Sequence, residues 1–199
     1  MKKLVVASNN AGKIKEIKRI LKDINIDVLS LKDMELNIDV EEDGLTFEDN
    51  ARKKCTEIYK ELVKRGENNF IVMSDDSGLE VEYLNSEPGV FSARYAGEHG
   101  NDKKNNEKLL LNLKGVDYKN RKARFVCQLA IINYKNEYKS IRGIVEGYIL
   151  ESEKGNEGFG YDPLFFYEPL NKSFAELTLE EKNRISHRGF ALKKFREII

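Results

Sequence analysis

The chain has 199 residues, with 34 lysines and arginines and 34 aspartates and glutamates, so its formal net charge is zero. A general nucleic-acid-binding protein is usually more basic, which argues against a stable nucleic-acid partner but leaves room for a local basic pocket. The length favours one domain with a substantial hydrophobic core, and it is large enough for two lobes.

The two cysteines, Cys55 and Cys127, are far apart and form no CxxC motif. This spacing argues against a zinc ribbon and a disulfide scaffold, and it favours free thiols in a reducing compartment. The N-terminus has a short basic start and too few apolar residues for a signal peptide, and no stretch approaches the length of a membrane span. We therefore expect a cytoplasmic protein that has no membrane partner.

The first part of the chain predicts a strand, a loop and a helix. Leu4–Ala7 is a short apolar run typical of a buried strand. After the polar segment SNNAGK, apolar residues from Ile14 onward follow helical spacing. Val28–Leu31 predicts a second strand, and Asn37–Asp43 predicts an acidic loop.

The central part of the chain holds the clearest helix, Phe47–Val63, whose apolar residues recur at i, i+4, i+7 and i+8. Gly66 suits the C-terminal cap of this helix. Phe70–Met73 predicts a strand that leads into two aspartates. Leu79–Leu84 alternates apolar and acidic residues, which predicts a separate, half-exposed strand.

The last part predicts a hairpin and further helices. A helix is expected at Asn105–Leu113, and long strands at Arg124–Tyr134 and Tyr138–Leu150 are joined closely enough to be antiparallel. A capping-box pattern at Thr178 predicts a short helix, and His187–Ile199 predicts the closing helix. Together with the βα start, these elements predict an α/β fold with a mixed sheet.

SNNAGK, between a strand and a helix, is the first candidate for a ligand site. Free N–H groups at a helix start and the amino group of Lys13 can bind phosphate. The segment is not a Walker A loop, because it contains only Gly12 and because Ile14 follows the lysine. A polar turn without a ligand is the alternative interpretation.

Two acidic segments are candidates for a metal site. Glu41–Asp43 precedes the helix at Phe47, where acids either complement the helix dipole or bind a hard cation. Asp75 and Asp76 end a strand, where they form either a turn or a ligand site. Successive side chains of a strand point to opposite faces, so the two aspartates should not share one metal. One carboxylate from each segment would suit Mg²⁺.

Two further segments could recognise an aromatic ligand. Gly158–Pro163 (GFGYDP) combines glycines that allow close approach with aromatic rings that can stack on a base, or it is a packed aromatic turn. His187 and Arg188, with Lys182 nearby, offer several hydrogen-bond donors, or they are surface charges after a capping Ser186. No convincing nucleophile is present, so water activated by a carboxylate and a metal is the natural attacking group.

These segments resemble the Ham1-type inosine triphosphate pyrophosphatase family. The matching blocks run in family order over almost the whole chain: SNNAGKIKEI, EEDGLTFEDNARKK, DDSGLEVEYLNSEPGVFSARYAG, GFGYDPLFF and ELTLEEKNRISHRGFALKKF. Many members have Thr-Gly-Asn where this chain has Ser8-Asn9-Asn10, a difference that affects the detailed loop conformation more than its role.

The resemblance implies a single domain over residues 1–199, with a long curved mixed β-sheet flanked by helices that form two lobes with a central cleft. It implies a homodimer that uses Mg²⁺ to hydrolyse ITP, dITP and XTP to the monophosphate and pyrophosphate, which keeps them out of DNA and RNA. It implies that Asp76 is the general base, and that Asp76 and Glu42 hold the metal, with Glu41 the less favoured choice. The residues implied to contact the substrate are Ser8, Asn9, Asn10, Ala11, Gly12, Lys13, Lys54, Ser77, Phe159, Gly160, Tyr161, Asp162, Lys182, His187 and Arg188.

Base selection has a physical interpretation. Donors from His187 or Arg188 would favour the O6 acceptor of hypoxanthine and xanthine, and they would mispair with the amino group of adenine, at about 1–3 kcal/mol. This argument rejects ATP but does not reject GTP, whose base also carries O6.

Two alternatives stay open at this point. The first is a pyrophosphatase that acts on other modified nucleoside triphosphates. The second is a non-catalytic nucleotide- or RNA-binding module, suggested by the lysine-rich segments Asp102–Lys104 and Lys119–Arg124.

Overall fold

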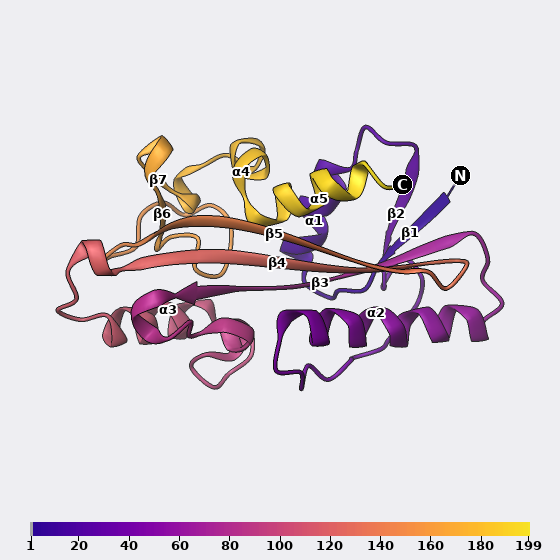
Figure 1. Ribbon diagram of the computed structural model, residues 1–199, viewed down its shortest axis with the longest axis horizontal. Helices are drawn as coiled ribbons and strands as arrows, with labels where there is room; N and C mark the ends of the chain where they lie inside the picture. Colours follow the sequence, from indigo (N-terminus) through magenta and orange to yellow (C-terminus); the bar gives the residue numbers. More distant parts are fainter. Residues whose placement is uncertain (1) are drawn as a thin grey trace. The chain divides into compact units, whose positions relative to one another are not determined.

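The computed structural model describes residues 2–199 and contains a seven-stranded sheet with flanking helices (Figure 1). The strand order is β2-β1-β3-β4-β5-β6-β7. The strands are β1 (Lys2–Val6), β2 (Ile26–Ser30), β3 (Phe70–Val81), β4 (Lys122–Asn133), β5 (Tyr138–Ile149), β6 (Phe165–Tyr167) and β7 (Lys172–Ser173). The helices are α1 (Ala11–Ile20), α2 (Phe47–Lys64), α3 (Asp102–Asn112), α4 (Leu179–Ile185) and α5 (His187–Arg196).

The sheet is mixed, which confirms the predicted α/β class. β1 pairs in parallel with β2 and β3, whereas β5–β6 and β6–β7 are antiparallel. β4 and β5 are sheet neighbours joined by only residues 134–137, a connection too short for a parallel crossover. The predicted hairpin is therefore confirmed.

The chain divides into two compact units. Unit 1 comprises residues 1–76, 127–143 and 191–199, and unit 2 comprises residues 77–126 and 144–190. Strands β3, β4 and β5 and helix α5 each contribute residues to both units.

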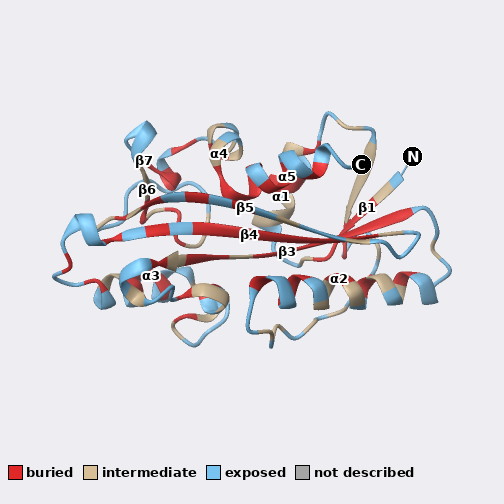
Figure 2. Ribbon diagram, viewed as in Figure 1, coloured by how far each residue is buried: buried red, intermediate tan, exposed pale blue. Residues whose placement is uncertain are grey.

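In unit 1, most residues of β1, β3 and β4 are buried (red in Figure 2), and their apolar side chains form one cluster on each face of the sheet. Alternate residues of each strand enter opposite clusters, because side chains of a strand point to opposite faces. Leu4 and Val6 of β1 lie in the cluster that contains Ile17 of α1, whereas Val5 lies in the cluster that contains Ala51 of α2. Helices α1 and α2 therefore cover opposite faces of unit 1 (Figure 1).

The predicted cap of α2 is confirmed. Gly66 adopts a positive φ of 76°, and the N–H of Glu67 donates to the carbonyl of Leu62 at 3.0 Å. This six-residue return bond is the pattern by which glycine ends a helix. Both cysteines are buried and free, as the sequence predicted.

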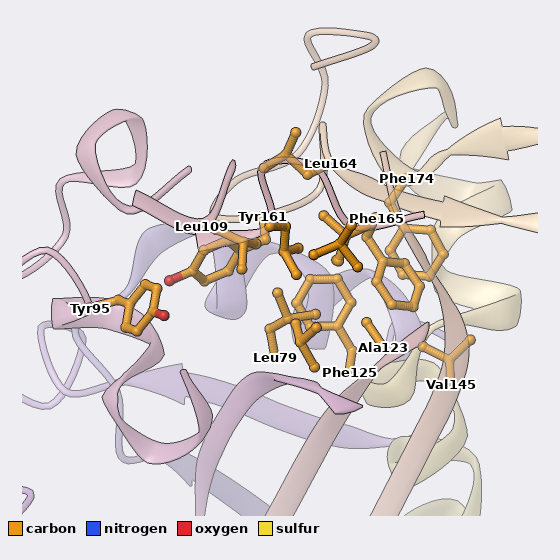
Figure 3. Close-up of a cluster of buried hydrophobic side chains, with 14 of the residues drawn as sticks. Leu79, Tyr95, Leu109, Ala123, Phe125, Val145, Tyr161, Leu164, Phe165 and Phe174 are labelled. Atoms are coloured by element: carbon orange, nitrogen blue, oxygen red, sulfur yellow. The ribbon is translucent and has the colours of Figure 1, made fainter. Parts of the chain in front are cut away.

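Unit 2 has one large aromatic core (Figure 3). Phe125 of β4, Phe165 of β6 and Phe174 form its centre, with ring centroids 4.6–5.9 Å apart. Tyr161 belongs to the same core and donates from its hydroxyl to the carbonyl of Ser92 at 2.9 Å. The core thus fixes the segment that follows the glycine-rich loop.

Two expectations about elements were wrong. The region predicted as two strands is one continuous strand, β3, followed by a short 3₁₀ helix at Glu82–Leu84. Tyr83, expected on the buried face, is 55% exposed, because it lies in that 3₁₀ helix. Among residues 2–199, no helix is long and apolar enough to cross a lipid bilayer.

Candidate active site

The loop between β1 and α1 forms the predicted strand–loop–helix arrangement. Asn10 caps α1 and accepts a hydrogen bond from the N–H of Lys13 at 3.0 Å, and Ser8 Oγ accepts from the N–H of Asn10 at 3.2 Å. Asn9, Asn10 and Ala11 are exposed, and α1 carries no acid in its first turn. The helix start is therefore accessible to an anion and is not neutralised by a carboxylate of its own.

Lys13 and Lys54 both contact β3 just beyond the end of β1. The last backbone bond between the two segments runs from the N–H of Ala7 to the carbonyl of Met73, at 2.8 Å. Two residues further along β3, the carbonyl of Asp75 accepts from the amino groups of Lys13 at 3.2 Å and Lys54 at 3.1 Å. Both lysines predicted to bind phosphate are therefore gathered at one point of the sheet edge.

Asp75 and Asp76 point to opposite faces of β3, which confirms the prediction from strand alternation. The Asp75 side chain is fully buried, bonds Lys13 of α1 at 2.8 Å and accepts from the thiol of Cys127 at 3.3 Å. Asp76 lies on the α2 side, with its Oδ1 3.9 Å from the amino group of Lys54.

Glu42 joins this group from the loop before α2. Its Oε1 accepts from the amino group of Lys54 at 2.6 Å. We call Lys13, Glu42, Lys54, Asp75 and Asp76 the Asp76 cluster. It sets two ammonium groups against three carboxylates, so that negative charge is in excess.

Asp76 has the environment of a general base. It is 5% exposed, and burial raises the pKa of its carboxyl, against the opposing attraction of Lys54 and Lys13. A raised pKa makes a carboxylate a better proton acceptor near neutral pH. Among residues 2–199, its Oδ2 is buried without a hydrogen-bond partner.

A Mg²⁺ ion fits these donors. The carboxylates of Asp76 and Glu42, both beside the Lys54 amino group, are hard oxygen ligands, and the excess negative charge of the cluster favours a cation. Within the described part of the chain, no group of three or more His, Cys, Asp or Glu residues is arranged to hold a metal. Mg²⁺ does not require such a group, because it is usually bound by one or two carboxylates together with waters and phosphate oxygens.

Unit 2 holds a second set of polar side chains around the glycine-rich loop. Asp162 Oδ2 accepts from the buried amino group of Lys182 and from the N–H of Phe159, the latter at 2.9 Å. The Lys182 amino group also lies 4.8 Å from the centre of the Phe159 ring, within range of a cation–π contact. Gly158 has φ +80°, and a Cβ there would lie 2.1 Å from Asp162 Oδ2, so only glycine fits.

His187 and Arg188 complete this set, and they are not the surface charges that the alternative interpretation expected. They are 4% and 1% exposed. The His187 ring stacks on Phe125 at 4.8 Å, and an Arg188 guanidinium nitrogen donates to Ser77 Oγ at 3.2 Å. Ser186 does act as expected of a cap, since its Oγ accepts from the N–H of Gly189 at 3.1 Å. We call Phe159, Asp162, Lys182, His187 and Arg188 the Lys182 cluster.

Helix α3 holds the glycine-rich loop in place. Asp102 Oδ2 accepts from the N–H of Gly160 at 2.7 Å, and Asn106 Nδ2 donates to the carbonyl of Gly160 at 3.2 Å. The two side chains, one helical turn apart, thus bind both sides of one residue. Asp102 belongs to a segment that the sequence analysis considered for RNA binding.

The sequence analysis missed several residues that support these clusters. They are Asn50, Asp102, Asn106 and Cys127. The available signal was helical spacing, because Asn50 lies four residues before Lys54 and Asp102 four before Asn106. Cys127 offered no local signal.

The second lysine-rich segment does not offer a free basic surface at its centre. Arg121 is 2% exposed, and its guanidinium donates to the carbonyls of Ile149 and Leu150, both at 2.7 Å. This arginine therefore ties β4 to the end of β5 and is not available to phosphate.

Comparison with known proteins agrees with this geometry. Residues 4–198 match the Ham1 family. The chain belongs to the Ham1 family. It is 59% identical over 197 residues to a dITP/XTP pyrophosphatase of Clostridium perfringens, covering 99% of this chain and 97% of that protein. It is 46% identical over 199 residues to a dITP/XTP pyrophosphatase of Bacillus subtilis, covering 100% and 98%.

Solved structures give the same result. The structure of the Ham1 protein of Staphylococcus aureus matches with a TM-score of 0.84 and 43% identity, covering 98% of this chain and 97% of that one. The predicted family and the predicted α/β fold with a mixed sheet are thereby confirmed. The assignments of individual residues to substrate, base and metal stay predictions.

Proposed function

We propose that this Ham1-family protein hydrolyses deaminated purine nucleoside triphosphates, namely ITP, dITP and XTP, to the monophosphate and pyrophosphate. The proposal is supported by full-length relatives that are named dITP/XTP pyrophosphatases. The observation that carries it is the Asp76 cluster, where a buried carboxylate with a raised pKa stands beside two lysines at the end of β1.

The Asp76 cluster would receive the triphosphate. Lys13, Lys54 and the exposed N–H groups at the start of α1 would neutralise the phosphate oxygens, with Ser8 to Gly12 forming the loop around them. Asp76 would accept a proton from water while the water oxygen bonds to the α-phosphorus. The bond from the α-phosphorus to the bridging oxygen then breaks, and pyrophosphate leaves with the electron pair of that bond.

Mg²⁺, held by Asp76 and Glu42, would neutralise charge on the phosphates. The chain itself provides the remaining parts: a base, two ammonium groups and a helix start. Asp75 acts from the opposite face of β3 by holding Lys13.

The Lys182 cluster would receive the base. The Phe159 ring would stack on it, while Lys182, His187 and Arg188 would offer donors to the O6 acceptor, with Ser77 beside Arg188. Adenine would place its amino group against these donors. The side chain of Tyr161 is committed to the core, so Gly160 and Tyr161 would contact the base through the backbone.

A substrate panel tests the proposal. Pyrophosphate release would be measured with ITP, dITP, XTP, dUTP, ATP and GTP, with Mg²⁺ and with EDTA. We expect turnover of ITP, dITP and XTP in Mg²⁺, little with the other three nucleotides, and none in EDTA. Preferential turnover of dUTP would favour a pyrophosphatase for other modified nucleotides.

A non-catalytic binding module would give a different result. No nucleotide would be hydrolysed, and RNA binding would weaken steeply as salt is raised. The burial of Arg121 and the zero net charge both argue against that outcome. The homodimer that the family resemblance implies and the cytoplasmic location expected from the sequence also stay predictions, and the dimer would be tested by light scattering.

A further inference from the structure

Helix α2 places Asn50 against the strand that carries Asp76. Asn50 lies one helical turn before Lys54, and side chains at this spacing share a face of the helix. That face meets β3, because the Ser74 hydroxyl donates to the carbonyl of Ala51 and because Lys54 lies 3.9 Å from Asp76 Oδ1. Asn50 is fully buried there.

The orientation of the Asn50 amide is fixed from the other side. The backbone N–H of Gly44 donates to Asn50 Oδ1 at 2.8 Å. An N–H donor identifies the oxygen end of an amide, so the nitrogen end is the one directed away from Gly44. A Cβ at residue 44 would lie 2.7 Å from Asn50 Oδ1, so this approach requires glycine.

Two buried polar atoms in this region, one donor and one acceptor, lack a hydrogen-bond partner in the described part of the chain. Asn50 Nδ2 is a buried donor and Asp76 Oδ2 is a buried acceptor, and neither completes a hydrogen bond within residues 2–199. The two side chains are close enough for Asn50 to lower the pKa of Asp76, against the larger effect of burial. Buried polar groups almost always find partners, and each of these atoms is the kind of partner that the other lacks.

The hydrogen bond between Gly44, in the loop before α2, and residue 50 would not by itself require an amide side chain. Aspartate at position 50 would accept the N–H of Gly44 equally well, but it would place a second acceptor toward Asp76. Only asparagine offers an acceptor to Gly44 and a donor to Asp76 at a side chain of this length.

We infer that Asn50 is a positioning residue, which donates from Nδ2 to Asp76 Oδ2 and so holds the carboxylate with Oδ1 toward Lys54. This inference rests on the proposed role of Asp76 as general base. Without the amide, the carboxylate can rotate away from the attacking water, which slows the reaction without weakening substrate binding.

Four variants test the inference: N50A, N50D, D76N and the double variant N50A/D76N. In N50A and N50D we expect kcat for ITP to fall about 10- to 100-fold, with KM within about threefold of the wild-type value. N50D is the sharper probe, because it keeps the bond to Gly44 and replaces the donor toward Asp76 by an acceptor. In the double variant we expect no loss beyond that of D76N, since Asn50 acts through Asp76.

T46A is the matched control. Thr46 caps the same helix by accepting from the N–H of Asp49 at 3.1 Å, so T46A loosens the start of α2 without touching Asp76. Its Tm should fall while kcat stays at the wild-type value. If N50A does not fold, N50D with a normal Tm decides the question.

Three outcomes would overturn the inference. One is wild-type kcat in N50D, which would show that the role of Asn50 is limited to its hydrogen bond with Gly44. Another is a further tenfold loss in N50A/D76N relative to D76N, which would show that Asn50 acts independently of Asp76. The third is near-normal activity of D76N, which would contradict the proposed role of Asp76 as general base. This failure can be told apart from a failure of the Asn50 inference, because D76N leaves Asn50 unchanged.

Discussion

The two polar clusters differ in their balance of charged side chains. In the Lys182 cluster of unit 2, the buried cations Lys182 and Arg188 outnumber the one carboxylate, Asp162, which also accepts from the N–H of Phe159. In the Asp76 cluster of unit 1, three carboxylates face two lysines, and a buried oxygen of Asp76 has no partner within residues 2–199.

The difference agrees with the two roles proposed above. A cluster in which carboxylates outnumber ammonium groups is suited to receive a cation, phosphate groups and a proton, all of which change its charge. A cluster in which cations outnumber carboxylates is suited to present hydrogen-bond donors to the acceptor oxygens of an uncharged base. Changes in the Asp76 cluster should therefore lower kcat, and changes in the Lys182 cluster should raise KM.

The largest expected effect is that of D76N. Replacing the proposed base should lower kcat for ITP by about 10²–10⁴-fold, the usual contribution of general base catalysis. The variant should remain folded, because Asn has the same shape and removes a charge that burial disfavours. Steady-state kinetics with circular dichroism would check both statements.

The pKa of Asp76 also sets the sign of a stability effect in D76N. Burial raises the folded-state pKa above its ordinary value of 3.8, so the ionised carboxylate destabilises the fold at any pH above the folded-state pKa. That cost disappears as the pH falls toward 3.8. In EDTA, D76N should therefore have a Tm at neutral pH at least equal to that of the wild type, with the difference narrowing in acid.

D75N provides the comparison for D76N within the same strand. Asn at position 75 keeps an oxygen that accepts from Lys13, and its amide nitrogen replaces only the oxygen that accepts from the Cys127 thiol, so the loss of kcat should be smaller than in D76N. Equal collapse of both variants would contradict the assignment of separate roles to the two faces of β3.

The second-largest effect is expected in the Lys182 cluster. The side chains of Lys182 and Asp162 are 4% and 3% exposed, and removing one partner of such a pair costs about 3–5 kcal/mol of unfolding free energy. K182M should show this loss together with a raised KM for ITP. Urea unfolding and steady-state kinetics measure the two quantities.

A double variant separates stability from recognition. In K182M/D162N no buried carboxylate is left unpaired, and the amide oxygen can still accept from the N–H of Phe159. Stability should largely return while the KM for ITP stays high. If KM returns with stability, Lys182 contributes to the fold only.

Local rules predicted part of the Asp76 cluster, whereas the choice of Asp76, Glu42 and Lys54 came from the family resemblance. Side chains of a strand alternate between the two faces of the sheet, which places Asp75 and Asp76 on opposite faces. The polar segment between a predicted strand and a predicted helix identifies the loop that begins at Ser8. The wrong division of β3 into two strands has a physical cause. Adjacent acids are typical of a turn, but here Asp75 is held by Lys13, which is 62 residues away in the chain.

The supporting residues could not be predicted in the same way. Asn50 looks like any polar position of an amphipathic helix until Gly44 and Asp76 are seen on either side of it. Asp102 looks like the start of a charged helix, and its partner Gly160 is 58 residues away. Such side chains act through tertiary contacts, which composition and periodicity do not encode.

A smaller effect is expected in D102A, which removes one of the two contacts that α3 makes with Gly160. Loss of this bond, worth about 0.5–1.5 kcal/mol, should raise KM for ITP about 2- to 12-fold with kcat unchanged, because the loop that carries Phe159 loosens. E98A is the matched control, since Glu98 pairs with Lys104 on the surface nearby. A change in kcat without a change in KM would contradict the prediction that α3 supports the base-binding Lys182 cluster.

The smallest effect is expected at two helix caps, one in each unit. Thr46 Oγ1 accepts from the N–H of Asp49, and Thr178 Oγ1 accepts from the N–H of Glu181. Either threonine replaced by alanine should cost about 1 kcal/mol of unfolding free energy, measured in urea. For T46A, kcat and KM should stay within about twofold of the wild-type values, because the cap touches no residue of the Asp76 cluster. T178A should change KM more than kcat, because α4 carries Lys182. A larger change in kcat than in KM would contradict the separate roles assigned to the two clusters.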